Sequence, residues 1–312
     1  MIKIVWRQVE ELASVFKRTS IEIDPLTDPQ LYPSINDDKE NVLRYFLVMV
    51  ALDHRTQIPG YSYFSSKIGG KEFSGAFLLY RLGKIMYDND STFFSPERLV
   101  KITKKDVEKW LVSDTGVVRD PEVRAGLLKD LGYKLIKMYN GSVEDLIEQS
   151  NHRLKDDDGG LIDRLKIFRA YEDPVEKKSY LLAKFLIRRN LFHPIDLHNM
   201  QLPIDNHLTR IAIRTGIIES DDYVLFTNMR EAIYEEDIII RLQVRRAYKK
   251  ISEISNHAPD KLDDYLWMHG KFICTYQNPK CDLCSLQSAC LAYKNVERRR
   301  LQEHKYINTW YY

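Results

Sequence analysis

The sequence predicts an all-α fold, and three observations support that prediction. Apolar residues recur at the three- and four-residue spacing of a helix in most segments, whereas alternating strand patterns are nearly absent. Hydrophobic residues make up 44% of the 312 residues, enough for a sizeable core. No apolar run is long enough to span a bilayer, which excludes a membrane-embedded protein.

The first expected helices lie in the N-terminal fifty residues. Val5, Val9, Leu12 and Phe16 predict one helix, and a Pro- and Asp-rich connection follows it. A second, strongly amphipathic helix is expected over 41–53. It runs into Asp53-His54-Arg55-Thr56-Gln57, and five polar residues in that position usually form a solvated turn. The aromatic- and glycine-rich stretch after it, up to about residue 75, is a candidate substrate pocket.

Further helices are expected at 75–87, 95–102, 104–112, 121–139, 161–170 and 178–190. The buried stripe of the 121–139 helix is predicted to comprise Leu128, Leu131, Leu135 and Met138. Asn140-Gly141 should end this helix, because both residues tolerate the left-handed backbone of a C-cap. The loop 156–160 is expected to be exposed.

Charge indicates little about partners. The net charge is +2, so any basic face must be local. The richest cationic stretches, 241–250 and 294–300, are typical of solvated helix faces. The abundance of Ile, Lys, Glu and Tyr points to a thermophile. Because nothing at the N-terminus resembles a secretory signal, we expect an intracellular, cytoplasmic protein.

All four cysteines lie in one short stretch. Cys274, Cys281, Cys284 and Cys290 are separated by six, two and five residues. Four thiolates brought together by short loops hold either an iron–sulfur cluster or a zinc ion, and the spacing alone does not choose between them. Two disulfides are a third alternative, which an intracellular location disfavours.

The residues around the cysteines resemble a known family. The run DYLWMHGKFICTYQNPKCDLCSLQSACLAYK is similar to the C-terminal cluster segment of endonuclease III and the related adenine-specific DNA glycosylases. The resemblance implies that the four cysteines hold a 4Fe–4S cluster as cofactor. It also implies that Lys280, in the loop between the first two cysteines, faces DNA phosphates.

A second motif, 202–211 (LPIDNHLTRI), resembles the segment that carries the essential carboxylate of the same family. Taken alone, Asp205 is typical of a helix N-cap. The resemblance implies instead that Asp205 is catalytic, since a carboxylate stabilises the positive charge that builds on a sugar when its N-glycosidic bond breaks. We expect His207 and Arg210 of this motif to contact DNA.

A third segment resembles the family's helix–hairpin–helix, although it departs from it. Laying 172–181 (EDPVEKKSYL) on the family hairpin implies that Lys178 is the nucleophile of a bifunctional glycosylase/lyase, with Lys177 and the apolar tip Val175 on DNA. The alternatives are that Lys178 is a surface lysine or that Lys177 takes its role. Pro174 and Glu176 replace the family's two glycines, so ordinary anchoring of duplex phosphates is doubtful here.

The resemblance also implies a domain organisation and a function. We expect a central helical domain at 41–195 with the degenerate hairpin, and a cluster domain from 1–40 and 196–312. The implied activity is that of a monomeric DNA N-glycosylase and AP lyase, which flips a damaged or mismatched base from a DNA duplex into a pocket. Two alternatives remain: an N-glycosidase acting on a modified nucleotide or RNA, and a non-catalytic nucleic-acid-binding homologue.

Overall fold

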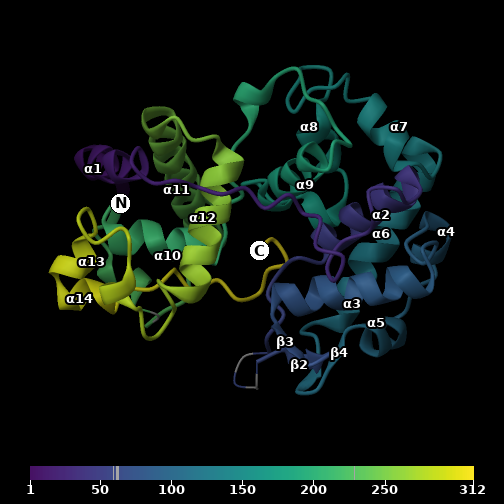
Figure 1. Cartoon of the computed structure of the whole chain (residues 1–312), viewed down its shortest axis with the longest axis horizontal. Helices are drawn as coiled ribbons and strands as arrows, with labels where there is room; N and C mark the ends of the chain where they lie inside the picture. The colour runs from purple at the N-terminus through teal and green to yellow at the C-terminus, as the bar shows by residue number, and fades with distance from the viewer. Residues whose placement is uncertain (59, 61–62, 228) are drawn as a thin grey trace. The chain divides into compact units, whose positions relative to one another are not determined.

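The computed structural model describes residues 1–58, 60, 63–227 and 229–312. They are mostly helical and form two compact units (Figure 1). Unit 1 comprises Met1–Asp24 and Met200–Thr309, and unit 2 comprises Pro25–Asn199 with Trp310–Tyr312. None of the helices in these ranges is both long and apolar enough to cross a membrane.

Most helices of unit 2 lie close to the expected ranges, but the helix Val143–Glu148 was not expected. The helices are α2 (Lys39–Ala51), α3 (Ala76–Asn89), α4 (Pro96–Leu99), α5 (Lys104–Trp110), α6 (Pro121–Tyr139), α7 (Val143–Glu148), α8 (Leu161–Leu165) and α9 (Lys177–Arg188). Asn140 ends α6 in a left-handed conformation with φ of 51°, as predicted. The expected helix at 161–170 is instead the short α8 and a separate 3-10 turn, Arg169–Tyr171.

Two expectations for unit 2 are wrong in detail. Met138 is 52% exposed, because the buried stripe of α6 passes from Leu135 to Tyr139, one turn later on the same face. The region near 65–75 contains a hairpin, β2 (Ser65–Ile68) and β3 (Lys71–Ser74), which turns at two positive-φ glycines. The candidate pocket predicted here includes 59, 61 and 62, which lie outside the described residues.

Short strands are a general correction to the all-α expectation. Besides the β2–β3 hairpin, Val112–Ser113 (β4) pairs with Gly116–Val117 (β5), and Ile2–Ile4 (β1) pairs with Ile218–Ser220 (β6), all antiparallel. Each strand has four residues or fewer, too short for an alternating pattern to stand out in the sequence.

An aromatic cluster determines where unit 2 begins. Tyr32 packs on Phe46 of α2 and on Phe185 of α9, with ring centroids 6.0 and 6.2 Å apart, and Phe46 lies 5.8 Å from Phe185. The segment 25–40, which was expected to accompany the cluster domain, therefore belongs to unit 2. The last three residues also join unit 2, where the Trp310 indole donates a hydrogen bond to the Arg169 carbonyl at 2.9 Å.

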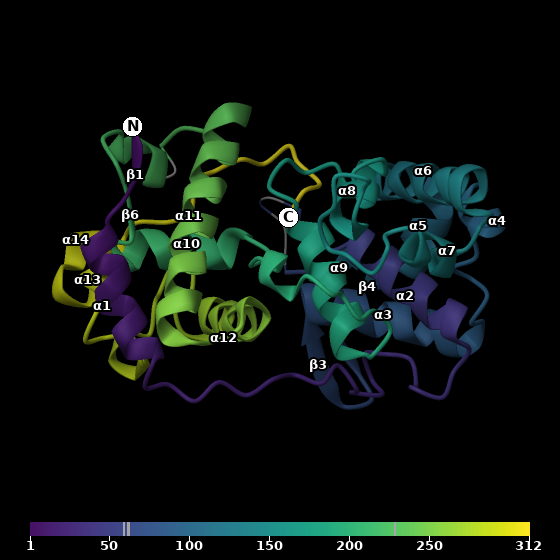
Figure 2. The same ribbon diagram turned by 90° about the horizontal axis from the view of Figure 1, so that it is seen from above.

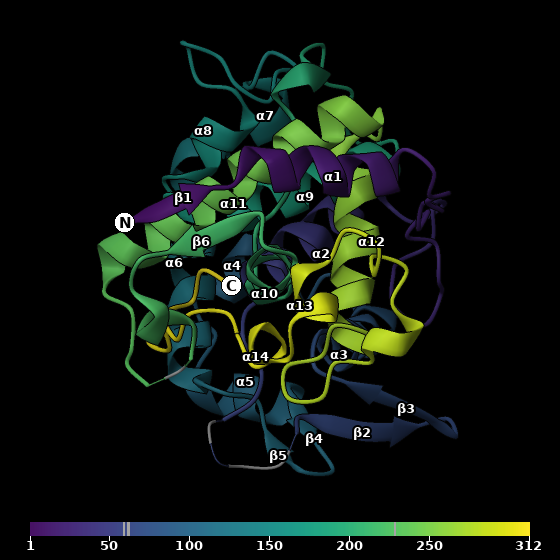
Figure 3. The same ribbon diagram turned by 90° about the vertical axis from the view of Figure 1, so that its left-hand side faces the viewer.

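Unit 1 is built around its longest helix, α11 (Tyr234–Ser255). Its helices are α1 (Trp6–Phe16), α10 (Asn206–Thr215), α11 (Tyr234–Ser255), α12 (Pro259–Phe272), α13 (Leu291–Lys294) and α14 (Val296–Arg299). The apolar face of α1 shares one core with α10, α11 and α12. Figure 2 shows α1 beside α11, and Figure 3 shows β1 running along β6. The N-terminal segment is thereby held against a part of the chain more than 200 residues away.

A buried ionic group ties the end of unit 1 to α11. The Asp237 carboxylate accepts hydrogen bonds from Arg241 and His304, each at 2.7 Å, and all three side chains are almost fully buried. Burial alone would raise the pKa of Asp237, but the hydrogen bonds from His304 and Arg241 and their positive charge hold it well below its usual value.

We expect Asp237→Ala to lower the free energy of unfolding by about 3–5 kcal/mol, because it removes the carboxylate that a buried arginine and a buried histidine both bind. Urea denaturation at neutral pH measures the change. The pKa of Asp237 is lower in the folded protein than in the unfolded chain, so the carboxylate stabilises the fold at pH values above its unfolded pKa of about 3.9. This stabilisation is lost as the pH falls below that value. Glu253→Ala, which breaks the exposed pair with Lys250, is the control and should cost less than about 1 kcal/mol. Equal effects of the two variants would contradict the prediction.

Candidate functional site

A fully buried lysine stands at the start of α9 in unit 2. Lys178 is 0% exposed, and its Nζ donates a hydrogen bond to the Ala51 carbonyl at the end of α2, at 2.5 Å. The same Nζ lies 3.2 Å from Nδ1 of His54. In the described part of the chain no carboxylate reaches it within ion-pair distance. The alternative of a surface lysine is therefore wrong, because water does not reach this amine.

Arg124 of α6 holds the chain that surrounds this lysine. Its guanidinium is fully buried and donates to the carbonyls of Leu52 at 2.6 Å and Arg55 at 2.9 Å. These carbonyls follow the last turn of α2, where a cation also meets the negative end of the helix dipole. These hydrogen bonds hold the turn against the interior of the unit, so His54 is buried instead of exposed to solvent.

The surroundings of Lys178 disfavour its charged form. Burial lowers the pKa of Lys178 well below its usual value, and the nearby charges of Lys177 and Arg124 lower it further. Asp53 and Asp173 act in the opposite direction but more weakly. The N-terminal end of α9 adds a partial positive charge. A larger fraction of this amine is consequently uncharged, as a nucleophile must be.

His54 was not singled out by the sequence. The solvated turn predicted for 53–57 is wrong at this residue, which is only 5% exposed. Burial, followed by the charges of Arg124 and Lys178, lowers the pKa of His54 well below its usual value, which favours the neutral imidazole. Its Nε2 has no hydrogen-bond partner in the described structure. The one signal in the sequence was a histidine directly after an apolar helix.

The hairpin before α9 contains an internal anion. Glu176 adopts a left-handed backbone with φ of 57°, and its buried carboxylate accepts hydrogen bonds from Lys155 at 2.6 Å and binds Lys166 at 2.7 Å. Burial alone would raise the pKa of Glu176, but these two lysines lower it. Val175 is 0% exposed, so it does not fit the expected role of an apolar tip on DNA. Lys177 is also buried, and its Nζ donates to the Asp53 carbonyl at 3.0 Å.

In unit 1, Asp205 is the N-cap of α10. Its Oδ1 accepts a hydrogen bond from the Leu208 amide at 3.0 Å, and the side chain is 8% exposed. The cap expected from the sequence alone is thus present. Among the described residues nothing donates a hydrogen bond to the second carboxylate oxygen, which leaves that oxygen for another function. The catalytic role stays a prediction.

Arg210 is a structural residue. It is buried, and its guanidinium donates to the carbonyls of Cys274 and Gly270 at 2.8 Å and to the Glu303 carboxylate at 2.8 Å. These bonds leave it unsuited to the expected DNA contact, because its donors already have protein acceptors. His207 is partly exposed, and a contact between it and DNA stays a prediction. A Cβ on Gly270 would lie 2.6 Å from His207 Cβ, so only glycine allows this close approach of α12 to α10.

The four cysteines are gathered as free thiols. Burial raises the pKa of Cys284 to about 12, and the other three thiols add to this effect, which places all four within electrostatic range of one another. Arg214 fixes the first of them, since it donates to Cys274 Sγ at 3.4 Å. No three His, Cys, Asp or Glu side chains in the described ranges converge closely enough to hold one metal ion. Lys280 is exposed in the connecting loop.

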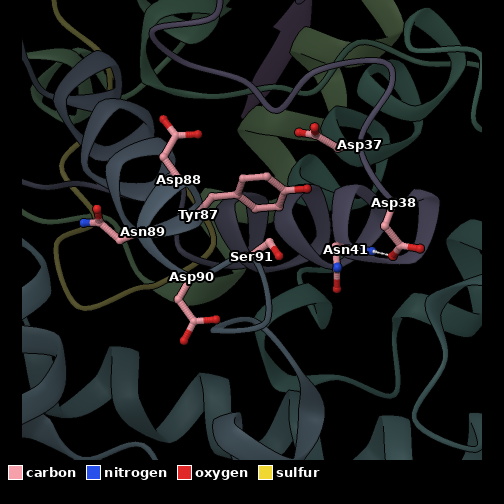
Figure 4. Close-up of a pocket in the computed structure, with 8 residues that line it drawn as sticks. All are labelled: Asp37, Asp38, Asn41, Tyr87, Asp88, Asn89, Asp90 and Ser91. Atoms are coloured by element: carbon pink, nitrogen blue, oxygen red, sulfur yellow. Dashed lines mark hydrogen bonds between the residues drawn. The ribbon is translucent and has the colours of Figure 1, made fainter.

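A separate pocket of about 490 Å³ in unit 2 has a strongly acidic lining (Figure 4). It is lined by Asp37, Asp38, Asn41, Tyr87, Asp88, Asn89, Asp90 and Ser91. Two of its carboxylates already pair with cations, Asp88 with Lys84 and Asp90 with Arg98. The remaining negative charge of the lining disfavours the binding of phosphates.

No protein-family model matches the sequence, and no curated protein matches it. Solved structures do resemble the chain. A trapped endonuclease III–DNA covalent intermediate is 14% identical, with a TM-score of 0.49 over 94% of this chain and 97% of that one. A non-covalent endonuclease III–DNA complex is 16% identical, with a TM-score of 0.44 over the same shares. A thermostable thymine-DNA glycosylase is 12% identical, with a TM-score of 0.43 over 92% of this chain and 94% of that one.

Proposed function

We propose that this protein is a DNA N-glycosylase with AP lyase activity. The observation that carries the proposal is the buried amine of Lys178, which has no carboxylate within ion-pair distance among the described residues and lies near the cations Lys177 and Arg124. An amine kept partly neutral at physiological pH can attack C1′ of a nucleotide, displace the base and form a Schiff base. β-Elimination of the 3′ phosphate then breaks the strand.

Asp205 supplies the second chemical group in this proposal. Its free carboxylate oxygen stabilises the oxocarbenium-like charge on the sugar, while the other oxygen keeps the carboxylate oriented by capping α10. Asp205 and Lys178 belong to different units, and the geometry of each supports its role separately.

The four thiols fit a 4Fe–4S cluster as the proposed cofactor. The four thiols lie within electrostatic range of one another, and the residues around them resemble the cluster segment of endonuclease III. A bound cluster would tie the loops between Cys274 and Cys290 together and hold them in unit 1.

The partner in this proposal is DNA with a base turned out of the helix, which is least costly for a damaged or mismatched base. The expected DNA contacts that solvent reaches are His207, which is partly exposed, and Lys280, which is exposed, whereas Lys177 is buried beside Lys178. The alternative substrate, a modified nucleotide or RNA, is favoured by Glu176. Its carboxylate stands at the helix start where a duplex phosphate would otherwise bind.

Lys178→Gln should abolish covalent trapping of the protein on DNA by borohydride, because the amide cannot form a Schiff base. The measurement uses oligonucleotides that carry different lesions opposite each base, scored for base release, strand nicking and trapping. Lys137→Gln on the exposed face of α6 is the control and should trap like the wild type. Undiminished trapping by Lys178→Gln would move the role to Lys177 or another amine.

Asp205→Asn should slow base release about 100- to 1000-fold, because asparagine keeps the cap but removes the negative charge. Affinity for the lesion duplex should be equal or higher, since a carboxylate near phosphates is lost, and the melting temperature should change little. Asp38→Asn is the matched control, because Asp38 caps α2 through the Asn41 amide in the same way. If Asp205→Asn releases the base at the wild-type rate, or if this variant unfolds, Asp205 acts only as a helix cap.

Protein purified without oxygen should be brown and contain about four irons per chain, as four cysteine ligands imply. Metal analysis and the visible absorbance test this. Cys281→Ala should lose iron and lower the melting temperature, because cluster binding contributes to the stability of its unit. Stoichiometric zinc in colourless wild-type protein would overturn the cofactor assignment.

A further inference from the structure

We propose that His54 is the proton acceptor and positioning partner of Lys178. The inference rests on the proposed function and adds a residue to it. The imidazole Nδ1 stands 3.2 Å from Nζ, and Nζ is held from a second direction by the Ala51 carbonyl at 2.5 Å. If Nζ donates to both groups, its two hydrogens are engaged and the lone pair of the neutral amine is left for the reaction.

Either nitrogen of the Nζ–Nδ1 contact can be the donor, so the distance alone does not fix the tautomer of His54. We assign Nζ as the donor, so that Nδ1 carries no proton and the hydrogen sits on Nε2. Nε2 is buried, and no protein group in the described ranges accepts from it. A bare Nδ1 in contact with the reacting amine is the arrangement that a general base requires.

The charges around the pair keep the imidazole neutral. Besides Lys178 itself, Arg124 from α6, Arg119 preceding it and Lys177 from α9 all lower the pKa of His54, after the effect of burial. The carboxylates that face the amine are Asp53, which follows α2, and Asp173, which precedes α9. The cations around His54 and Lys178 thus outnumber the anions. At a pH at which an exposed imidazole is already protonated, His54 stays unprotonated and can still accept a proton.

The step can be written on an abasic site, whose open sugar presents an aldehyde. The lone pair of Nζ forms a bond to C1′, and the carbonyl electrons move to the sugar oxygen. One Nζ proton passes to Nδ1 of His54, which returns it to that oxygen. The oxygen departs as hydroxide while the nitrogen lone pair closes the C=N bond, and solvent neutralises the hydroxide. The product is the iminium ion that borohydride reduces.

The test measures the rate of borohydride trapping on an abasic-site duplex between pH 5 and 10. For the wild type the rate should rise with pH as Lys178 loses its proton, and then level off. In His54→Asn the amide oxygen still accepts from Nζ but cannot take a proton, so the plateau should fall about 100- to 10,000-fold. His193→Asn, an exposed histidine of the same unit, is the control and should follow the wild type.

A wild-type trapping signal that is unchanged in His54→Asn at every pH would overturn the inference while leaving the proposed function intact. No trapping by the wild type on any lesion or abasic site would instead remove the proposed function, and this step with it.

A second measurement avoids the variant altogether, in case His54→Asn fails to fold. Nitrogen-15 spectra of the histidine side chains in wild-type protein should show His54 as the Nε2–H tautomer, still neutral at pH 5.5, where an ordinary imidazole of pKa about 6.5 is about nine-tenths protonated. A protonated His54 at that pH, or a hydrogen on Nδ1, would contradict the pairing.

Discussion

The candidate amine site depends on one buried guanidinium. Arg124 binds the carbonyls that α2 leaves unsatisfied at its C-terminal end, which closes the following turn over the interior. Without that cation the polar residues after α2 would be expected in water. With it, His54 and the Ala51 carbonyl lie on either side of the Lys178 amine. A single desolvated charge therefore determines both the backbone and the chemistry.

In unit 1, buried arginine side chains bind backbone carbonyls around the cysteines in the same way. Arg214 donates to the carbonyls of Thr275 at 2.6 Å, Tyr276 at 2.7 Å and Leu301 at 2.7 Å, and Arg210 does so for Cys274. Loop carbonyls that no helix or strand satisfies are thus bound by guanidinium groups from α10. The helix that Asp205 caps is consequently also the helix that orders the cysteine loop, so the carboxylate and the thiols are coupled through α10.

The burial of the Lys178 amine in unit 2 lowers the stability of the fold, because this amine has no ion partner among the described residues. Glu176, two residues earlier, shows the opposite arrangement, because two lysines neutralise its buried carboxylate. The two residues thus differ in whether a partner of opposite charge compensates for their burial.

The sequence by itself determined most helices of unit 2 and the cap at the start of α10. The period of apolar residues is local, and Asn140 or Asp205 acts on the turn beside it, so the bounds of α6 and the cap of α10 could be read directly. Burial of single polar side chains could not be read, because it depends on groups distant in the chain. His54 lies inside only because Arg124, seventy residues later, binds the carbonyls around it. Val175 and Arg210 look like surface residues in a motif, and only the packing of the whole unit showed that they are buried.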